Sequence, residues 1–511
     1  MRALLIYPRF PRSFWDFEKP LRLIGRKAML PPLGLVTVAA MLPPGWHLKL
    51  VDRNVREVRE DEWRWADLVL LTGMIVQKHD LIALIGEARR RGKRVAVGGP
   101  YATALPDELA RTGADYLVLD EGEITIPLFV RAIAAGEPSG VFRAQGARPD
   151  LRETPIPRFD LLDLEAYSEM ALQFSRGCPH RCEFCDVTVL FGRRPRTKQP
   201  GQFIAELLQL YDLGWRRNIF VVDDNFVAHS REVKAMLRVL RPWLVEHGHP
   251  VTFDTQASLD LARDPELLSL MTGCNFGAVF LGIETPDSAR LAEAGKHQNL
   301  RQPLETSVET ITRAGLRVMA GFIIGFDGET AGTGERIVRF VEQTAIPTAF
   351  FSMLQALPGT ALWQRLEREG RLCGEAGVNQ NSLMNFEPTR PLAEVAQEYV
   401  RSFHEIYDPS RYLGRAYRHY RLLAAAPRRH RPRRRQRRMV SPRILRALAL
   451  VLWRQGVWRE TRWLFWPYLL GIALHNRRDL FSYLGLCGHF EHFYEFRGIV
   501  EREIAQQLEA R

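Results

Sequence analysis

The sequence predicts an α/β protein in three parts: a doubly wound parallel sheet, a partial barrel of six strand–helix units, and a mostly helical C-terminal part. Three observations support this prediction. Short apolar runs alternate with helical patterns up to about residue 130, the alternation resumes from residue 172 to about 360, and only helical patterns follow. A chain of 511 residues is also too long for a single hydrophobic core, which agrees with several domains.

The first part, residues 1–140, carries five short apolar runs that we expect to be buried parallel strands. Helical patterns between them, for example 33–42 and 80–91, complete a Rossmann-like alternation of strand and helix. The expected strands are 2–7, 47–51, 68–71, 94–97 and 116–119. In such sheets, ligands bind beyond the carboxyl ends of the strands.

Small or polar residues stand at three of these carboxyl ends. Thr72 and Gly73 follow the third run, Gly98, Gly99 and Pro100 the fourth, and Glu121, Gly122 and Glu123 the fifth. Glycine lets the backbone approach a ligand closely, but a glycine after a strand is equally typical of an ordinary turn. A binding edge and simple turn chemistry both remain open on this evidence.

Residues 141–168 contain several prolines and no clear periodicity, so they are expected to form a linker. The second part, residues 169–360, again alternates strand and helix, with helical segments such as 200–213 and 304–314. Its expected strands are 172–175, 218–222, 252–255, 278–283, 317–324 and 349–354. Six such units favour a partial, TIM-like barrel over a second open sheet, although periodicity alone does not separate the two.

The third part, residues 361–511, contains amphipathic helical patterns at 394–407 and 442–457, separated by a basic loop at 427–438. Eight arginines between residues 428 and 438 account for most of the net charge of +12. We interpret this run first as a solvated loop, next as a contact for anionic lipid, and least as a nucleic-acid site.

Cysteine usage and apolar segments predict a cytoplasmic protein. The chain has six cysteines, none before Cys178, which is unlike a secreted disulfide scaffold. The N-terminus lacks the pattern of an export signal, and the longest apolar segment, 463–474, is too short to cross a bilayer. Peripheral contact with the inner face of the membrane is an alternative.

The strongest motif is Cys178-Pro-His-Arg-Cys182-Glu-Phe-Cys185. Three thiolates on one loop can each bind a different iron of one [4Fe–4S] cube, and a missing fourth cysteine leaves one iron open. A structural zinc site needs four ligands, and His180, the only local candidate, lies between two of the cysteines, where ligation would strain the loop. The motif therefore predicts a three-cysteine cluster.

This spacing, with Phe184 before the last cysteine, resembles the signature of the radical S-adenosylmethionine (SAM) family. The resemblance implies SAM bound at the open iron, a 5′-deoxyadenosyl radical, and an electron donor such as flavodoxin or ferredoxin. The SAM contacts that it implies are Phe184, Asp223, Asp224, Asn225, Glu284, Gly321 and Gly325. Taken as residues alone, the carboxylate run at 223–225 could also cap a helix, with Ser230 as a rival cap, and the glycines could serve a turn.

An open α/β domain directly before such a barrel resembles the cobalamin-binding subfamily. The implied cobalamin contacts are the strand-end residues given above: Thr72, Gly73, Gly98, Gly99, Pro100, Glu121, Gly122 and Glu123. Many cobalamin proteins carry Asp-x-His-x-x-Gly after the first strand, whereas this chain has Pro8-Arg9-Phe10-Pro11 there. The lower ligand of cobalt is thus left open, and a degenerate domain kept for packing is the alternative.

The last 150 residues, with Asn385-Phe386-Glu387-Pro388, resemble the C-terminal domain of hopanoid C-2 methylases and their relatives. This resemblance implies methylation of an unactivated carbon of an apolar substrate, lipid or polycyclic, through the 5′-deoxyadenosyl radical and methylcobalamin. The alternatives are a radical SAM cyclase or rearrangement enzyme that uses cobalamin without methyl transfer, and a cobalamin or redox sensor. Nucleic acid is not an expected partner.

Four tryptophans of this last part, Trp453, Trp458, Trp463 and Trp466, are interleaved with arginines. Such a pattern is typical of a helix in a membrane interface, and equally of a helix pair packed on the barrel. The packed arrangement is the favoured prediction.

Overall fold

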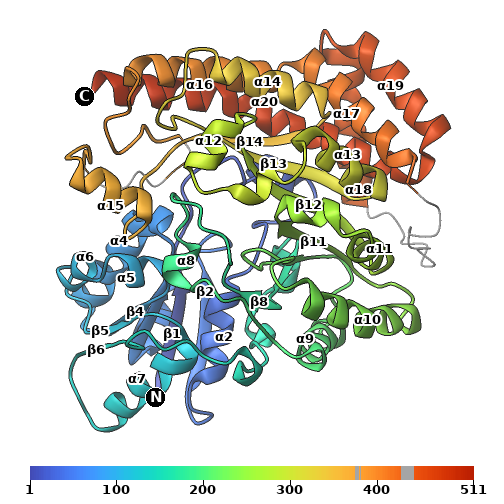
Figure 1. The fold of residues 1–511 in the computed structure, drawn as a ribbon. Helices are drawn as coiled ribbons and strands as arrows, with labels where there is room; N and C mark the ends of the chain where they lie inside the picture. The colour runs from blue at the N-terminus through green and yellow to red at the C-terminus, as the bar shows by residue number, and fades with distance from the viewer. Residues whose placement is uncertain (375–378, 380, 427–441) are drawn as a thin grey trace. The chain divides into compact units, whose positions relative to one another are not determined.

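The structure is a computed structural model that describes residues 1–374, 379, 381–426 and 442–511 (Figure 1). The predicted basic loop at 427–438 lies outside the described residues. The chain divides into two compact units. The first comprises Met1–Asp16, Lys27–Pro179 and Asp186–Val222, and the second Phe17–Arg26, His180–Cys185 and Asp223–Arg511.

The first unit contains a six-stranded parallel sheet in the order β2-β1-β3-β4-β5-β6. The strands are β1 (Arg2–Tyr7), β2 (His47–Asp52), β3 (Leu68–Thr72), β4 (Arg94–Gly98), β5 (Tyr116–Val118) and β6 (Gly140–Phe142). All five predicted strands are confirmed. The sixth, β6, was missed because its three residues are partly or fully exposed, so they form no apolar run.

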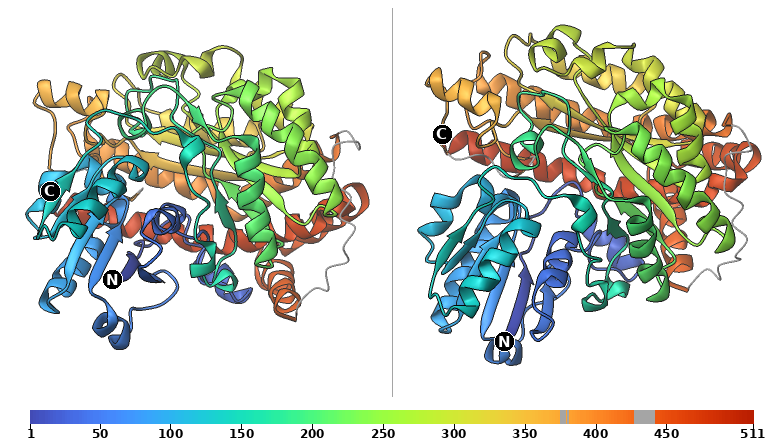
Figure 2. Two further views of the ribbon diagram at one scale, coloured as in Figure 1. Left: turned by 90° about the horizontal axis from the view of Figure 1, so that it is seen from below. Right: turned by 60° about the horizontal axis from the view of Figure 1, so that its bottom comes forward.

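Helices cover both faces of this sheet, as the alternating side chains of its strands require (Figures 1 and 2). Leu4 and Ile6 of β1 pack with α4 (Lys78–Arg90) on one face. Ala3 and Leu5 pack with α2 (Leu33–Met41) and α7 (Gly122–Ala134) on the other. The strand order changes direction at β1, between β2 and β3, which makes the carboxyl ends of β1 and β3 the topological switch point of the sheet.

The rest of the first unit prepares the cysteine motif. The predicted linker contains three short 3-10 turns, at Leu151–Glu153, Phe159–Leu161 and Leu164–Ala166. Strand β7 (Met170–Leu172) pairs in parallel with β10 (Asn218–Val221), and β8 (Ser175–Arg176) pairs antiparallel with β9 (Arg196–Thr197). The single strand predicted at 172–175 is therefore two short strands. Helices α8 (Val187–Leu190) and α9 (Pro200–Asp212) lie between these strands in sequence.

The second unit contains four parallel strands in the order β14-β13-β12-β11. They are β11 (Thr252–Ala257), β12 (Phe276–Glu284), β13 (Arg317–Ile324) and β14 (Thr348–Met353), and helices connect them, as in a strand–helix barrel. The chief helices here are α10 (Ser230–Glu246), α11 (Pro265–Gly273), α12 (Ser288–Glu293), α13 (Leu304–Ala314) and α14 (Thr333–Gln343).

The remaining described part of the second unit is helical. Its helices are α15 (Ala361–Arg368), α16 (Leu392–Ile406), α17 (Pro409–Ala424), α18 (Pro442–Trp453), α19 (Arg462–His475) and α20 (Leu480–Glu509), with a short helix α1 (Glu18–Leu23) from the start of the chain. The predicted fold class, parallel α/β sheets followed by a helical C-terminal part, is confirmed. Among the described residues, no helix combines the length and the apolarity needed to cross a bilayer.

Candidate active site

Cys178, in the first unit, follows β8 through a glycine that the backbone requires. Gly177 has φ +93°, and a Cβ atom there would lie 2.9 Å from the carbonyl oxygen of Gly192. The Cys178 amide donates a hydrogen bond to that same carbonyl at 3.2 Å. The first cysteine is therefore fixed by local backbone contacts on the side of α8.

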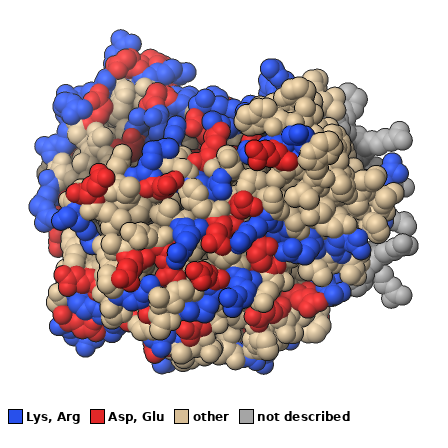
Figure 3. All heavy atoms as spheres, turned by 90° about the horizontal axis from the view of Figure 1, so that it is seen from above, with Lys and Arg blue, Asp and Glu red and all other residues tan. Residues whose placement is uncertain are grey.

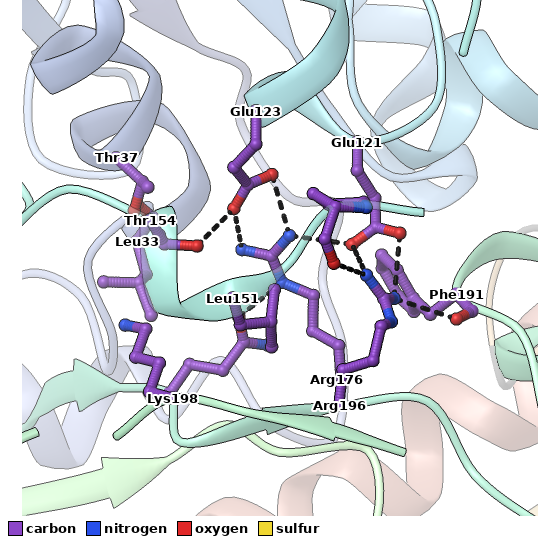
Figure 4. A network of polar contacts seen from close by, with 12 residues as sticks. Leu33, Thr37, Glu121, Glu123, Leu151, Thr154, Arg176, Phe191, Arg196 and Lys198 are labelled. Carbon is purple, nitrogen blue, oxygen red and sulfur yellow. Dashed lines mark hydrogen bonds and ion pairs between the residues drawn. The ribbon is translucent and has the colours of Figure 1, made fainter. Parts of the chain in front are cut away.

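A buried ion-pair network holds the strand that leads to Cys178 (Figure 4). Arg176 of β8 donates to Glu121 at 2.9 Å and to Glu123 at 2.8 Å, and Arg196 of β9 donates to Glu121 at 2.9 Å. Thr154 also donates to Glu123. Burial raises the pKa of Glu123, but the charge of Arg176 and the hydrogen bonds from Arg176, the backbone and Thr154 together outweigh burial, so the pKa is lowered and the carboxylate stays ionised.

This network places two of the predicted cobalamin contacts in a structural role. The carboxylates of Glu121 and Glu123 are paired with arginines, so a contact of these residues with cobalamin would use their backbone. Arg176 and Arg196, the partners, were not singled out from the sequence. Their arginine type gave no signal, because the pairing depends on contacts between residues 53 to 75 positions apart.

Cys182 and Cys185 belong to the second unit, where the turn after α12 supports their loop. The amide of Glu183 donates to the carbonyl of Ala294 at 3.0 Å. Gly295 has φ +69°, and a Cβ atom there would lie 2.5 Å from the carbonyl oxygen of Arg181. The Gln298 side-chain amide lies 3.5 Å from Cys182 Sγ, as a hydrogen-bond donor. Such donors stabilise negative charge on cluster sulfurs.

A buried cation lies beside the same cysteines. Lys296 forms an ion pair with Glu284, and both side chains are about one-tenth exposed. Burial lowers the pKa of Lys296, but the charges of Glu284, Cys182 and Cys185 outweigh burial and raise it. Lys296 is thus held as a cation next to two thiolates. Lys296 was not among the predicted site residues. It lies in the turn after α12, two residues before Gln298, and no sequence motif marks this turn as part of a site.

Glu284, predicted to contact SAM, ends β12 in a strained conformation. Its φ is +68°, which is uncommon for a residue other than glycine and typical of functional sites. The side-chain amide of Asn299 holds this turn by donating to the carbonyls of Gly282 and Ile283, each at 3.1 Å. A Cβ atom on Gly282 would lie 2.5 Å from the Glu284 carboxylate and 2.7 Å from Lys296 Nζ, so a larger residue there would displace this ion pair.

The segment 321–329, which includes the end of β13, contacts the aromatic residue of the cysteine loop. Phe184 meets Phe326 edge to face, with ring centroids 5.9 Å apart. Gly325 has φ +104°, and its amide donates to Glu329 Oε2 at 2.8 Å. Burial raises the pKa of Glu329 to about 7, although the Gly325 and Phe326 amides act to lower it. Gly321 lies within β13, where a Cβ atom would sit 3.1 Å from the ring of Phe280.

Asp223, Asp224 and Asn225 do not cap the helix that follows them. Helix α10 begins at Ser230, and its N-cap residue is His229, which makes no side-chain cap bond. Asp223 and Asn225 are buried, and Asn225 Oδ1 accepts from the amide of Ser258 at 3.0 Å. The helix-cap interpretation is therefore wrong, and the assignment of these residues to SAM stays a prediction.

The strand ends of the first sheet bring the predicted cobalamin residues together at its carboxyl edge. Thr72 and Gly73 follow β3 at the switch point, and Gly99 lies against them: its φ is +90°, and a Cβ atom would lie 2.2 Å from Thr72 Oγ1. A Cβ atom on Gly98 would lie 2.8 Å from the carbonyl oxygen of Val118 in β5. Pro100 and Gly122 begin α5 (Pro100–Ala104) and α7. This edge presents backbone and small side chains, which fits a flat ligand that approaches the backbone closely.

The cysteine loop has the chemistry of a cluster site. All three cysteines are free and partly exposed, and an amide donor and a buried cation face two of them. Within the described ranges, no three His, Cys, Asp or Glu side chains converge closely enough for a single metal ion. A [4Fe–4S] cube takes each thiolate on a different iron and does not need that convergence, so the residues fit a cluster better than zinc.

Comparison with known protein families assigns each part. Residues 23–130 match the B12 binding domain, residues 172–341 the radical SAM superfamily, and residues 360–506 a domain of unknown function. A hopanoid C-2 methylase from Rhodopseudomonas palustris is 34% identical over 476 residues, which cover 92% of this chain and 89% of that protein. The chain belongs to the cobalamin-binding radical SAM family. Its cofactors are a [4Fe–4S] cluster, SAM and cobalamin, as predicted.

Other relatives agree with this assignment. An uncharacterized methyltransferase from Synechocystis is 57% identical over 511 residues, covering 99% of this chain and 94% of that protein. Among solved structures, the radical SAM methyltransferase TsrM from Kitasatospora setae has a TM-score of 0.56 at 18% identity, covering 72% of this chain and 75% of that one. The radical SAM enzyme OxsB has a TM-score of 0.58 at 15% identity and covers all of this chain and 81% of that one. These structural likenesses bear on the fold.

Proposed function

We propose that this chain methylates an unactivated carbon of an apolar, lipid-like or polycyclic substrate. The observation that carries the proposal is the sequence identity to a hopanoid C-2 methylase, which extends through all three parts of the chain, including the C-terminal helices. Two further relatives, from Chlorobaculum tepidum, are named as bacteriochlorophyllide methyltransferases, and these names indicate polycyclic substrates.

When bound, the cluster and SAM supply the 5′-deoxyadenosyl radical, and cobalamin supplies the methyl group. The chain's own residues position and shield these groups. Cys178, Cys182 and Cys185 bind the cluster, with Lys296 and Gln298 opposing the negative charge of its thiolates. A one-electron donor such as flavodoxin or ferredoxin reduces the cluster.

The remaining site assignments follow the predicted positions. SAM is held by Phe184, by Asp223, Asp224 and Asn225, which follow β10, by the Glu284 turn, and by backbone at Gly321 and Gly325. Cobalamin is held at the switch-point edge by Thr72, Gly73, Gly98, Gly99 and Pro100, and by the backbone of residues 121–123. The proposed parts are 1–140 for cobalamin, 169–360 for the radical core and 361–511 for the helical domain.

A second candidate is a cyclase that uses cobalamin without methyl transfer. One relative carries the name of an anaerobic magnesium-protoporphyrin monomethyl ester cyclase from Rubrivivax gelatinosus and is 25% identical over 407 residues. Its lower identity and its coverage of 72% of this chain, against 92% for the hopanoid methylase, favour methyl transfer.

The experiment that separates the two uses SAM labelled in its methyl group, with reconstituted enzyme and apolar lipid extract as the substrate pool. Methyl transfer predicts label in an organic-soluble product, together with S-adenosylhomocysteine and 5′-deoxyadenosine. A cyclase predicts 5′-deoxyadenosine with no label in any product. The second result, obtained with a converted substrate, would overturn the proposal.

A further inference from the structure

Helices α18 and α19 are apolar but lie at the surface of the second unit. Helix α18 lies wholly within the described residues, and none of its twelve residues is buried, although its sequence PRILRALALVLW is largely apolar. Of the fourteen residues of α19, only Phe465 and Ile472 are buried. A helix that is apolar on all sides normally lies in a protein core or in a membrane.

The exposed side chains of α19 form one stripe. Trp463, Trp466, Leu470 and Leu474 are between 46% and 74% exposed. With 3.6 residues per turn, they fall within about 80° of the helix circumference, and Phe465 and Ile472 point to the opposite side. The helix thus uses one apolar face for the core and turns a second apolar face outward.

Trp453, at the end of α18, and Trp458, in the segment that joins α18 to α19, are exposed as well. They are 59% and 69% exposed, and the Trp466 indole donates to the carbonyl of Gly456 at 2.8 Å, which ties α19 to that segment. The segment that carries the four tryptophans packs on the protein through Phe465 and Ile472, but the tryptophans themselves are exposed, so the predicted packing of this helix pair does not bury them. We call the exposed residues 453, 458, 463, 466, 470 and 474 the aromatic face. Figure 3 shows a broad area of uncharged side chains on the right-hand side, where α19 lies in Figure 1.

The charges around the aromatic face are mainly positive. Between residues 442 and 479 the sequence contains seven arginines and two acidic residues, Glu460 and Asp479. Two of the seven, Arg454 and Arg459, are paired with Glu491 of α20. Arg443, Arg446, Arg477 and Arg478 are exposed, at the two ends of the α18–α19 segment. Exposed tryptophan and leucine flanked by arginine match the surface of a bilayer that contains anionic lipids, where indole rings lie at head-group level and arginines pair with phosphates.

We infer that the aromatic face docks the enzyme on an anionic lipid bilayer, with α19 lying in the plane of the interface. At a rise of 1.5 Å per residue α19 is about 21 Å long, shorter than the roughly 30 Å hydrocarbon core, so it lies on the membrane and does not cross it. A second copy of this chain fits the face less well, because a twofold contact would bring the two arginine-rich rims together. The inference deepens the proposed function by giving the enzyme access to a substrate dissolved in the bilayer, and its test does not depend on that function.

The test measures binding of the full-length reconstituted enzyme to vesicles by co-sedimentation. The vesicles are pure phosphatidylcholine, or an equal mixture of phosphatidylcholine and phosphatidylglycerol. The variant Trp458→Ser/Trp463→Ser/Leu474→Ser removes apolar side chains from the aromatic face without adding charge. The matched control Val239→Ser/Val245→Ser changes two valines of α10 that are 47% and 61% exposed.

We expect the wild type and the control to bind anionic vesicles, with binding weakened by salt, and the triple variant to bind at least about a hundredfold more weakly. Equal melting temperatures of the wild type and the triple variant would show that the variant is folded. Equal 5′-deoxyadenosine formation without vesicles would show that the loss of vesicle binding is not caused by a loss of the proposed activity. Absence of vesicle binding by the wild type, or equal binding by the triple variant, overturns the inference. The inference is also overturned if the wild type is a dimer in solution and does not bind vesicles, while the triple variant is a monomer.

Discussion

At the scale of single residues, the most informative finding is the buried charge beside the cysteine loop. Lys296 and Glu284 neutralise each other away from water, and the cation also faces two cluster thiolates. The free energy of desolvating such a pair is recovered only while both partners are present. The pair therefore couples the stability of the β12 turn to the electrostatics of the cluster.

Replacing Lys296 with methionine tests both roles. Loss of one partner from the buried pair should lower the free energy of unfolding by about 3–5 kcal/mol. Loss of the positive charge should also make the cluster's reduction potential more negative, measured by titration followed by electron paramagnetic resonance. The double variant Lys296→Met/Glu284→Met should regain stability and, because a negative charge is lost together with the positive one, part of the original potential. Lys234→Met, which breaks partly exposed ion pairs with Asp264 and Glu266 away from the cysteine loop, is the control. An unchanged potential in Lys296→Met would argue against the electrostatic role.

Glu329 gives a prediction about pH. Burial raises its pKa from 4.5 to about 7 in the folded chain, so the unfolded chain loses this proton at lower pH. Stability from this group is complete below pH 4.5 and is lost as the pH rises through 7, a loss of about 3 kcal/mol. Glu329→Gln keeps an acceptor for the Gly325 amide and cannot ionise. Its melting temperature should exceed that of the wild type at pH 8 but hardly at pH 5; Glu335→Gln on the exposed side of α14 should show no such difference.

At the scale of elements, β8 is two residues long and owes its position to the network of Figure 4. Its Arg176 joins α7, through Glu121 and Glu123, to the segment that carries Cys178, all within the first unit. A strand this short has too few ladder bonds to fix itself. The side-chain network supplies the missing constraint.

Arg176→Met should therefore affect both folding and cluster loading. Two buried carboxylates lose a partner, which should lower the free energy of unfolding by about 3–5 kcal/mol. Reconstituted protein should also contain less iron per chain, measured at a temperature where circular dichroism shows it folded. Arg158→Met breaks an exposed ion pair with Asp160 and should cost at most about 1 kcal/mol with full iron content. Full iron content in Arg176→Met would contradict a positioning role for the network.

Elements with strong periodicity could be predicted from the sequence, and irregular ones could not. Strands β1 and β13 and helix α13 were predicted residue for residue, because buried parallel strands and amphipathic helices leave a clear pattern. Strand β6 is exposed and the β8–β9 pair is too short to form a pattern. The cysteine loop was recognisable from spacing alone, whereas Lys296, Gln298, Arg176 and Arg196 depend on contacts that no local pattern encodes.

The tryptophan-rich helices show a different limit. Composition allowed either a position in a membrane interface or packing on the barrel, and it did not show that α19 packs through Phe465 and Ile472 while its tryptophans stay exposed. The helical period could have shown this arrangement, because Phe465 and Ile472 fall on one side of α19, the side that packs in the core. The stripe of Trp463, Trp466, Leu470 and Leu474 falls on the opposite side and is exposed.

At the scale of the whole molecule, one chain carries a cobalamin-binding part, a radical SAM core and a helical C-terminal part. Keeping both cofactor domains in one chain suits a reaction in which a substrate radical must receive a methyl group. The inferred docking of the aromatic face on a bilayer would bring that chain to the proposed apolar substrate.

The most direct test of this account is to purify the protein without oxygen, reconstitute it with iron, sulfide and cobalamin, and measure 5′-deoxyadenosine after addition of SAM, a strong reductant and apolar lipid extract. We expect bound corrinoid in the visible spectrum, formation of 5′-deoxyadenosine by the wild type, and loss of that product in Cys178→Ala, which retains corrinoid. A fully loaded cluster and adequate reductant with no 5′-deoxyadenosine from the wild type, or the same yield from Cys178→Ala, would contradict it.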